Sequence, residues 1–247
     1  MLRISRLATV LFIVLACCFA AGGLKAQTLS LDLGPTGGAT ERALQLIALV
    51  TILSVAPAIL IMVTSFTRII VVLSLLRSAI GTASAPPNTV IVSLALFLTA
   101  FVMAPTGKEI YTKAALPLLN GSISAATAFE RGADPIRTFM LQHVREKDLT
   151  LFLDIAKEPV PASPEATPLT SLVPAFMISE LRRAFEIGFL LFMPFLVIDL
   201  VVASILMSVG MMMLPPTTVS LPFKLIFFVL VDGWSLIAGS LVKSFAT

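Results

Sequence analysis

The chain has 247 residues, of which 57% are hydrophobic and 13% are charged, against about 45–50% and about 25% in an ordinary globular domain. Together with a mean hydropathy of +1.02, this composition excludes a soluble globular protein and indicates a membrane protein. The formal charge of +3, from 17 basic and 14 acidic side chains, is too small and too scattered for a nucleic-acid-binding face. We therefore expect no nucleic-acid partner.

The first segment predicts a cleavable signal peptide over residues 1–26. Arg3 and Arg6 precede an apolar run that small residues follow, which is the order found in secretory signals. An uncleaved first helix is the alternative, but the run falls short of the ~20 residues needed to span a membrane. A lipoprotein signal cut before Cys17 is a second alternative. Because Cys17 and Cys18 both lie in this segment, the mature chain would have no disulfide, thiolate nucleophile or Cys-ligated metal.

A flexible, Gly-rich N-terminal segment is predicted over 27–42, followed by a first hydrophobic helix pair over 43–106. The uncharged run 43–66 is long enough for one spanning helix. Arg68 and Arg77 follow it, and we expect them in a loop on the cytoplasmic side, as the positive-inside bias prefers.

The second helix of this pair is predicted over 88–104. Pro86 and Pro87 precede it, and proline is tolerated in the first turn of a helix but not in its interior. The composition then changes, and charges of both signs alternate over 107–183. This predicts a polar periplasmic segment, too long for the positive-inside bias to decide its side.

Within the polar segment, Asp134 and Pro135 predict an N-cap and the first residue of an amphipathic helix. The stretch 158–168 holds four prolines and predicts an extended linker. His143 is the only histidine, and we expect it to be solvated. Since a Ser-His-Asp or His-rich metal site would need this residue, and no Walker-type phosphate loop occurs, we predict neither enzyme activity nor a cofactor or metal.

A second hydrophobic helix hairpin is predicted over 184–247. Its apolar blocks, 184–213 and 221–242, are separated by Pro215 and Pro216, as in an antiparallel helical hairpin. The predicted fold class is therefore an all-α membrane protein with about four hydrophobic helices in hairpins. A polar helical insertion separates the second helix from the third.

Three ionisable residues interrupt these last apolar blocks: Asp199, Lys224 and Asp232. Charges at hydrocarbon depth usually face a partner or a water path. Counting ~1.5 Å per residue from the turn places Asp199 level with Asp232 and Lys224 about halfway. Lys224 and Asp232 lie roughly 80° apart around their helix, so no direct contact is expected between them. Buried ion pairs that fix helix register between subunits, a proton or ion relay, and exposure to a wet cavity are the alternatives.

The run Met211, Met212 and Met213 follows Gly210 directly. Unbranched thioether side chains form a soft apolar surface that can repack around different contacts. The alternatives are packing at a hairpin tip and a constriction that seals a passage. The second needs several copies around an axis, so it predicts a cyclic oligomer.

Most of the chain from about residue 43 resembles the FliP family of flagellar biosynthetic proteins. The stretches that carry the resemblance are PAFMISEL (174–181), AFEIG (184–188), PFLVIDL (194–200), GMMMLPP (210–216), LPFK (221–224) and VDGW (231–234). The resemblance implies a subunit of a type III export gate, and a flagellar gate more than its virulence counterpart.

Family members are implied to form a homo-oligomer, a pentamer, that joins FliQ and FliR in the bacterial inner membrane at the flagellar basal body, facing the periplasm. Unfolded flagellar polypeptides pass through its centre, while FlhA, FlhB, an ATPase and the proton-motive force act from outside this chain. The resemblance assigns a methionine gasket to Met211, Met212 and Met213. It also implies that the hairpins end raised toward the periplasm.

The same resemblance assigns subunit contacts to Glu180, Phe139 and Phe152. Contact with membrane lipid is expected from composition. A small secondary transporter, which would use the intramembrane charges as its substrate site, is the rival function. Against this rival function, the sequence contains neither an inverted repeat nor a discontinuous helix pair. A purely structural scaffold is a further alternative.

Overall fold

The computed structural model describes residues 39–82, 84–159, 161, 163–211 and 214–246. These residues form helices and no strand, which confirms the predicted all-α class. The chain divides between Leu53 and Ser54 into two compact units, and every tertiary contact discussed below lies within the second. The predicted signal peptide and its two cysteines fall outside the described residues.

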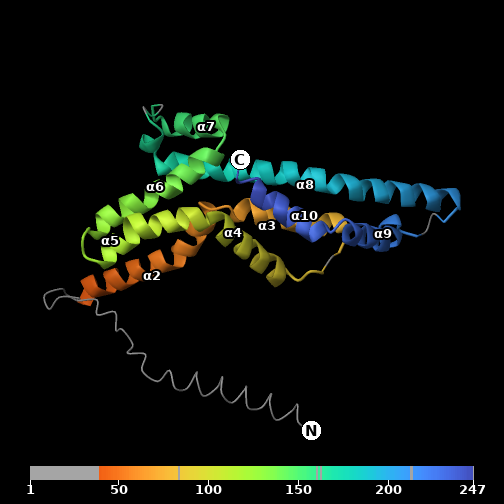
Figure 1. Ribbon diagram of the computed structural model, residues 1–247, viewed down its shortest axis with the longest axis horizontal. Coiled ribbons are helices and arrows are strands. Elements are labelled where there is room, and N and C mark those ends of the chain that lie inside the picture. The colour runs from red at the N-terminus through yellow and green to blue at the C-terminus, as the bar shows by residue number, and fades with distance from the viewer. Residues whose placement is uncertain (1–38, 83, 160, 162, 212–213, 247) are drawn as a thin grey trace, which may run out of the picture. The chain divides into compact units, whose positions relative to one another are not determined.

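The longest helix, α8, has 40 residues, and Figure 1 shows α3 and α9 beside it. In chain order the elements are α2 (Ala39–Met62), α3 (Phe66–Ile80), α4 (Asn88–Ile110), the π-helical turn η1 (Tyr111–Ala115), α5 (Leu116–Leu119), α6 (Ala125–His143), α7 (Glu146–Ala156), the 3₁₀ turn η2 (Pro164–Ala166), α8 (Leu169–Ser208), α9 (Pro216–Leu230) and α10 (Gly233–Lys243).

The main hydrophobic core is built on one face of α3. Four of its side chains are at most 1% exposed: Ile69, Val72, Leu73 and Leu76. Spacings of three and four residues place them on one side of the helix, and this side packs against α4 and α8. On α8, Gly188 permits a close approach, because a Cβ there would lie 2.3 Å from Leu75 Cδ1 on α3.

The loop that was expected to carry Arg68 and Arg77 is a helix instead, so that prediction is wrong. α3 runs through both residues and ends at Ile80; Gly81 follows it with a φ of 87°, a left-handed conformation that favours glycine. The apolar neighbours of Arg68 continue the buried stripe of the helix and bury the arginine with it. Arg77 lies in the last turn, where a cation interacts favourably with the helix dipole.

The second predicted helix begins where the prolines place it but extends further than predicted. α4 starts at Asn88 after Pro87 as its N-cap residue. It then continues past Pro105, and with η1 and α5 forms one continuous stretch to Leu119. Pro105 removes a single backbone donor, and neighbouring helices and local π-type adjustments let an apolar helix tolerate that loss.

The N-cap predicted at Asp134 is wrong. α6 begins at Ala125, where Ser124 Oγ accepts a hydrogen bond from Thr127 N at 3.3 Å, the usual chemistry of a helix N-cap. Pro135 lies buried in the helix interior. Across the proline-rich stretch 158–168, the described residues contain only the short turn η2, in keeping with the predicted linker.

The second hairpin differs from the predicted blocks at both ends. α8 begins at Leu169, so residue 183, the predicted end of the polar segment, lies inside a helix. The last apolar block is two helices, because α9 and α10 meet at Val231 and Asp232 with a bend of 63°. Asp232 has a φ of 49° there, which interrupts regular helix geometry.

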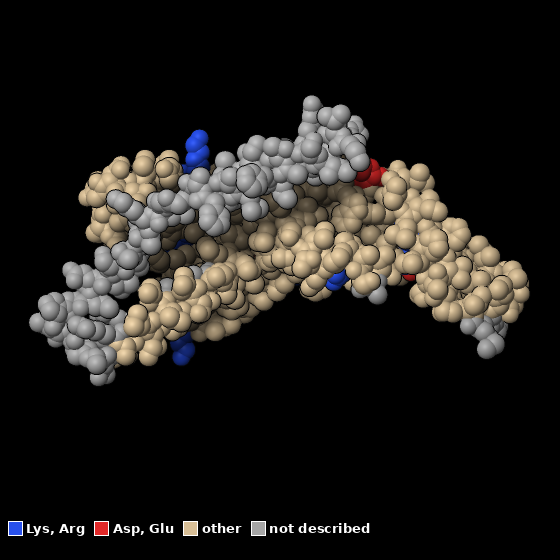
Figure 2. Space-filling model, turned by 90° about the horizontal axis from the view of Figure 1, so that it is seen from below, with Lys and Arg blue, Asp and Glu red and all other residues tan. Residues whose placement is uncertain are grey.

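Two helical stretches are long and apolar enough to cross a membrane: Asn88–Leu119, with a mean hydropathy of 2.1, and α8, with 2.6. Two bent pairs meet the same criterion jointly, Leu46–Met62 with α3 and α9 with α10. The described part of the chain therefore holds two to four candidate spans. Figure 2 shows isolated Lys, Arg, Asp and Glu side chains on a largely uncharged face.

Candidate functional site

An ion pair links the two arms of the second hairpin. Lys224 Nζ on α9 lies 2.6 Å from Asp199 Oδ2 on α8 and donates to the carbonyl oxygen of Ala79 on α3 at 3.3 Å. Ser220 Oγ donates to Asp199 Oδ1 at 2.5 Å. We call Asp199 and Lys224 the hairpin ion pair; its two charges tie α3, α8 and α9 together.

The hairpin ion pair is covered on one side and open on the other. The Lys224 side chain is 7% exposed, whereas that of Asp199 is 30% exposed. A cavity of about 410 Å³ lies beside them, and Thr217 and Thr218 contribute to its lining. Part of this lining is polar, and a polar cavity of sufficient size can hold water. The wet-cavity interpretation and the interpretation of a buried pair that fixes register between subunits both stay predictions. The pair forms within one chain.

The structure brings together two of the three predicted intramembrane charges. Asp232 is exposed at the junction of α9 and α10, and no ion pair joins it to another described residue. Lys224 pairs with Asp199, although counting from the proline turn had placed Asp199 level with Asp232. α8 ends at Ser208 and α9 begins at Pro216, so positions along the two arms of the hairpin must be counted from these two helix ends. Asp199 then lies nine residues before the end of α8, and Lys224 eight residues after the start of α9.

The methionine run begins at the tip of this hairpin. Gly210 adopts a φ of 77°, and Met211 N donates to Leu206 O at 3.0 Å, the closing hydrogen bond of a Schellman motif. Met211 is 45% exposed, while Met212 and Met213 lie outside the described residues. Met211 therefore presents a flexible thioether at the end of a hairpin held by an ion pair.

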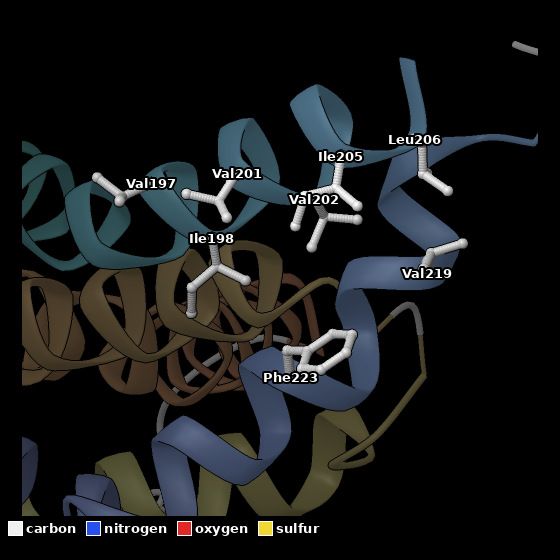
Figure 3. Close-up of a pocket in the computed structure, with 8 residues that line it drawn as sticks. All are labelled: Val197, Ile198, Val201, Val202, Ile205, Leu206, Val219 and Phe223. Atoms are coloured by element: carbon white, nitrogen blue, oxygen red, sulfur yellow. The ribbon is translucent and has the colours of Figure 1, made fainter. Parts of the chain in front are cut away.

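An apolar groove of about 420 Å³ lies between α8 and α9 near the tip. Its lining residues are all aliphatic or aromatic: Val197, Ile198, Val201, Val202, Ile205, Leu206, Val219 and Phe223. Figure 3 shows the α8 side chains and those of Val219 and Phe223 on α9 around the same space. With no polar group to orient a polar ligand, this surface suits contact with lipid or with another apolar chain.

A second ion pair, fully buried, lies between α3 and α8. Arg68 Nε donates to Glu180 Oε2 at 2.8 Å and Nη2 to Oε1 at 2.5 Å, and both side chains are 0% exposed. We call Arg68 and Glu180 the central ion pair. The two parallel hydrogen bonds match the planar guanidinium to the carboxylate, which joins α3 to α8.

Sequence reasoning missed the central ion pair, although its residues carry a usable signal. Arg68 lies four residues before Val72 on the apolar stripe of α3, and Glu180 lies four residues from both Phe176 and Ala184 on α8. Side chains four apart share one helix face. A charge on a buried stripe requires a partner, so two opposite charges in two such stripes could have been matched.

The residues predicted to contact neighbouring subunits differ in how far their side chains are exposed. Glu180 is fully buried, and its carboxylate is already engaged by Arg68. Phe139 is 7% exposed and meets the ring of Phe176 edge-on at a centroid distance of 6.0 Å. Phe152 on α7 is half-buried. The subunit contacts stay a prediction, with Phe152 the most accessible of the three.

His143 is not the solvated residue that was expected. It is 7% exposed, its Nδ1 lies 2.7 Å from Phe139 O, and its ring packs on that of Phe245 at 5.3 Å. Apolar neighbours on the helix face, rather than the polar composition of the segment, decide its burial. Among the described residues, no three His, Cys, Asp or Glu side chains are placed to hold a metal ion.

Comparison with known proteins gives one consistent result. The family model described as the FliP family matches residues 49–241. A flagellar biosynthetic protein FliP of Caulobacter vibrioides is 56% identical over 244 residues, covering 99% of this chain and 92% of the relative. Proteins of the same description from Pectobacterium carotovorum, at 57% identity (85% of this chain and 82% of the relative), and Bacillus subtilis, at 56% (81% and 91%), are also similar.

Proposed function

Because this chain belongs to the FliP family, we propose that it forms an oligomeric export gate with FliQ and FliR, through which unfolded flagellar proteins pass. Family membership makes it a membrane-embedded component of the flagellar export apparatus, and not an enzyme. Beyond family membership, the proposal assigns to this chain a pore, FliQ and FliR as partners, and a methionine ring that seals the pore. It also places the gate in the bacterial inner membrane, facing the periplasm.

The observation that carries the proposal is the position of Met211 at the exposed tip of an ion-paired hairpin. One tip cannot enclose a passage, but rotational symmetry would gather several tips around an axis. In a pentamer, Met211, Met212 and Met213 of each copy would then form a ring of soft thioether side chains. Such a ring closes on itself when empty and yields to a passing polypeptide.

The exposed apolar surface supports an assembly with apolar partners. On α8, Phe185, Phe189 and Leu190 are 59%, 65% and 67% exposed. Large exposed apolar surfaces mark sites that lipid or other chains cover. We assign this surface to contacts with neighbouring copies, FliQ, FliR and membrane lipid. The gating is passive in this scheme, with FlhA, FlhB and the energy sources acting on it from outside.

Native mass spectrometry of the tagged chain, extracted gently from its own membrane, tests this assembly. We expect a ring of five copies that carries small hydrophobic partners. A monomer or dimer, under conditions that preserve other membrane complexes, would remove the methionine ring. That result would favour a small secondary transporter.

Replacing Asp199 by Ala is expected to lower the yield of the assembled complex more than the conductance of each complex that forms. The change leaves Lys224 covered but unpaired, and losing a charged hydrogen-bond partner destabilises by about 1–3 kcal/mol. Asp232→Asn is the control, since Asp232 is an exposed carboxylate in the same hairpin with no ion pair to another described residue, and asparagine tolerates the left-handed φ of 49° there. Blue-native gels and export assays measure the two effects. Normal complex yield with lost export would instead favour a proton relay through Asp199.

A further inference from the structure

The end of the described chain folds back onto Arg68. Arg68 Nη1, the nitrogen that does not bond to Glu180, donates to both the carbonyl oxygen and Oγ of Ser244 at 3.1 Å. Its guanidinium carbon also lies 3.8 Å from the ring centroid of Phe245, which is a cation–π contact. We call Ser244, Phe245 and Ala246, which follow α10, the C-terminal strap.

Phe245 anchors the strap between two hydrophobic clusters. Its ring stacks on that of Phe139 at 6.2 Å and meets that of His143 at 5.3 Å. It packs against the cluster built on α3 and against a second cluster that contains Phe139, Met140 and Phe176. A single arginine therefore bonds to α8, to the strap backbone and to the strap ring.

The helix before the strap is attached more weakly. α10 leaves α9 through a bend of 63° and buries only Gly233, Ile237 and Leu241. A crevice of about 170 Å³, lined in part by Leu191, Leu236 and Ser240, separates it from α8. Apart from Ile237 and Leu241, which belong to the core built on α3, α10 is held at its C-terminal end by the contacts of the strap.

We propose that Arg68 is a positioning residue that latches the C-terminal strap and thereby holds α10 as a lever hinged at Val231 and Asp232. The latch concerns contacts within one chain, so it does not depend on the proposed gate. Opening it swings α10 away from α8 while the central ion pair stays in place. The strap, rather than the whole fold, is the part that Arg68 controls through Ser244 and Phe245.

Arg68→Lys separates the latch from the ion pair. A lysine keeps the positive charge beside Glu180, but its single ammonium lacks the planar fork needed to bond Glu180 and Ser244 together and to cover the ring of Phe245. We therefore expect the strap to be released in a chain whose interior charge remains paired. The matched control is Arg182→Lys, because Arg182 pairs with Glu186 on the exposed face of α8 at 2.9 Å.

Limited trypsin digestion of the full chain reports the release. The chain carries a C-terminal epitope tag without Lys or Arg and is purified in mild detergent with its partners. Lys243 is exposed, and cleavage after it removes the tag only when Ser244 and Phe245 are free to enter the protease. Since cleavage follows the population of the open form, we expect Arg68→Lys to lose the tag about tenfold faster than the parent, and Arg182→Lys to match the parent.

A second variant, Phe245→Leu, keeps Arg68 and Glu180 unchanged and removes the ring that the guanidinium covers. Faster tag loss is expected here too, with the remainder of the chain intact on the gel. If trypsin cleaves the Arg68→Lys chain at many sites, that variant has not folded, and the rate of tag loss from Phe245→Leu then tests the latch. Tag loss at the parental rate in the intact variants, or an equal acceleration by Arg182→Lys, overturns the latch.

Discussion

Replacing Met211, Met212 and Met213 together by Ala should leave the complex assembled but make the membrane leaky to small solutes. Each substitution removes a long, adaptable thioether from the tip, and an oligomer repeats that loss in every copy. The hairpin ion pair and the apolar groove lie on α8 and α9, outside the altered residues, so assembly is expected to survive. Complex yield on native gels and dye or ion flux across vesicles measure the two outcomes.

The control for this experiment is a double variant, Met62→Ala with Met193→Ala. Met62 ends α2 and Met193 lies in the interior of α8, and they are 42% and 44% exposed, comparable to Met211. The same chemical change away from the tip should leave the membrane tight. A triple variant as tight as its parent, with normal complex yield, would show that the methionines do not form a seal.

Glu180→Ala is expected to lower the free energy of unfolding by about 3–5 kcal/mol, the effect of removing one partner of a buried ion pair. Arg68 would remain in a site with 0% exposure and without its carboxylate. Denaturant titration of the purified chain in mild detergent, followed by circular dichroism, measures the change.

Glu186→Ala provides the matched control on the same helix. Glu186 pairs with Arg182, but the two side chains are 60% and 58% exposed, and an exposed pair contributes about 0–1 kcal/mol. A double variant, Arg68→Met with Glu180→Leu, should recover much of the loss, because apolar residues of similar volume replace a buried pair with little destabilisation. Equal effects of Glu180→Ala and Glu186→Ala would contradict the burial of the central ion pair.

The sequence was sufficient for the helical class and for the start of α4. Composition indicated a membrane protein, and Pro87 placed the start of α4 correctly. The predicted helix boundaries were wrong where a short motif typical of a helix start lies inside a longer helix. Asp134 and Pro135 carry the chemistry of a helix start, yet a helix already capped at Ser124 runs through them.

The candidate site was harder to predict because ionisable residues were expected to be exposed to water. Arg68 suggested a loop and His143 a solvated surface, whereas apolar neighbours at helical spacing buried both. The residues of the hairpin ion pair were identified but not their pairing. Their relative position depends on where α8 ends, at Ser208, and where α9 begins, at Pro216, and the count from the proline turn placed neither point.

The contacts of Arg68 also set an order of events during synthesis. Glu180 follows it by 112 residues and Ser244 by 176. At about 5–20 residues per second, the carboxylate is made about 6–22 s after the arginine, and Ser244 about 9–35 s after it. Arg68 lies in the first turn of α3, and α3 is made before any of these partners exists. The translocon therefore handles α3 as a charged segment first, and the arginine has all its ligands only after Ser244 has been made.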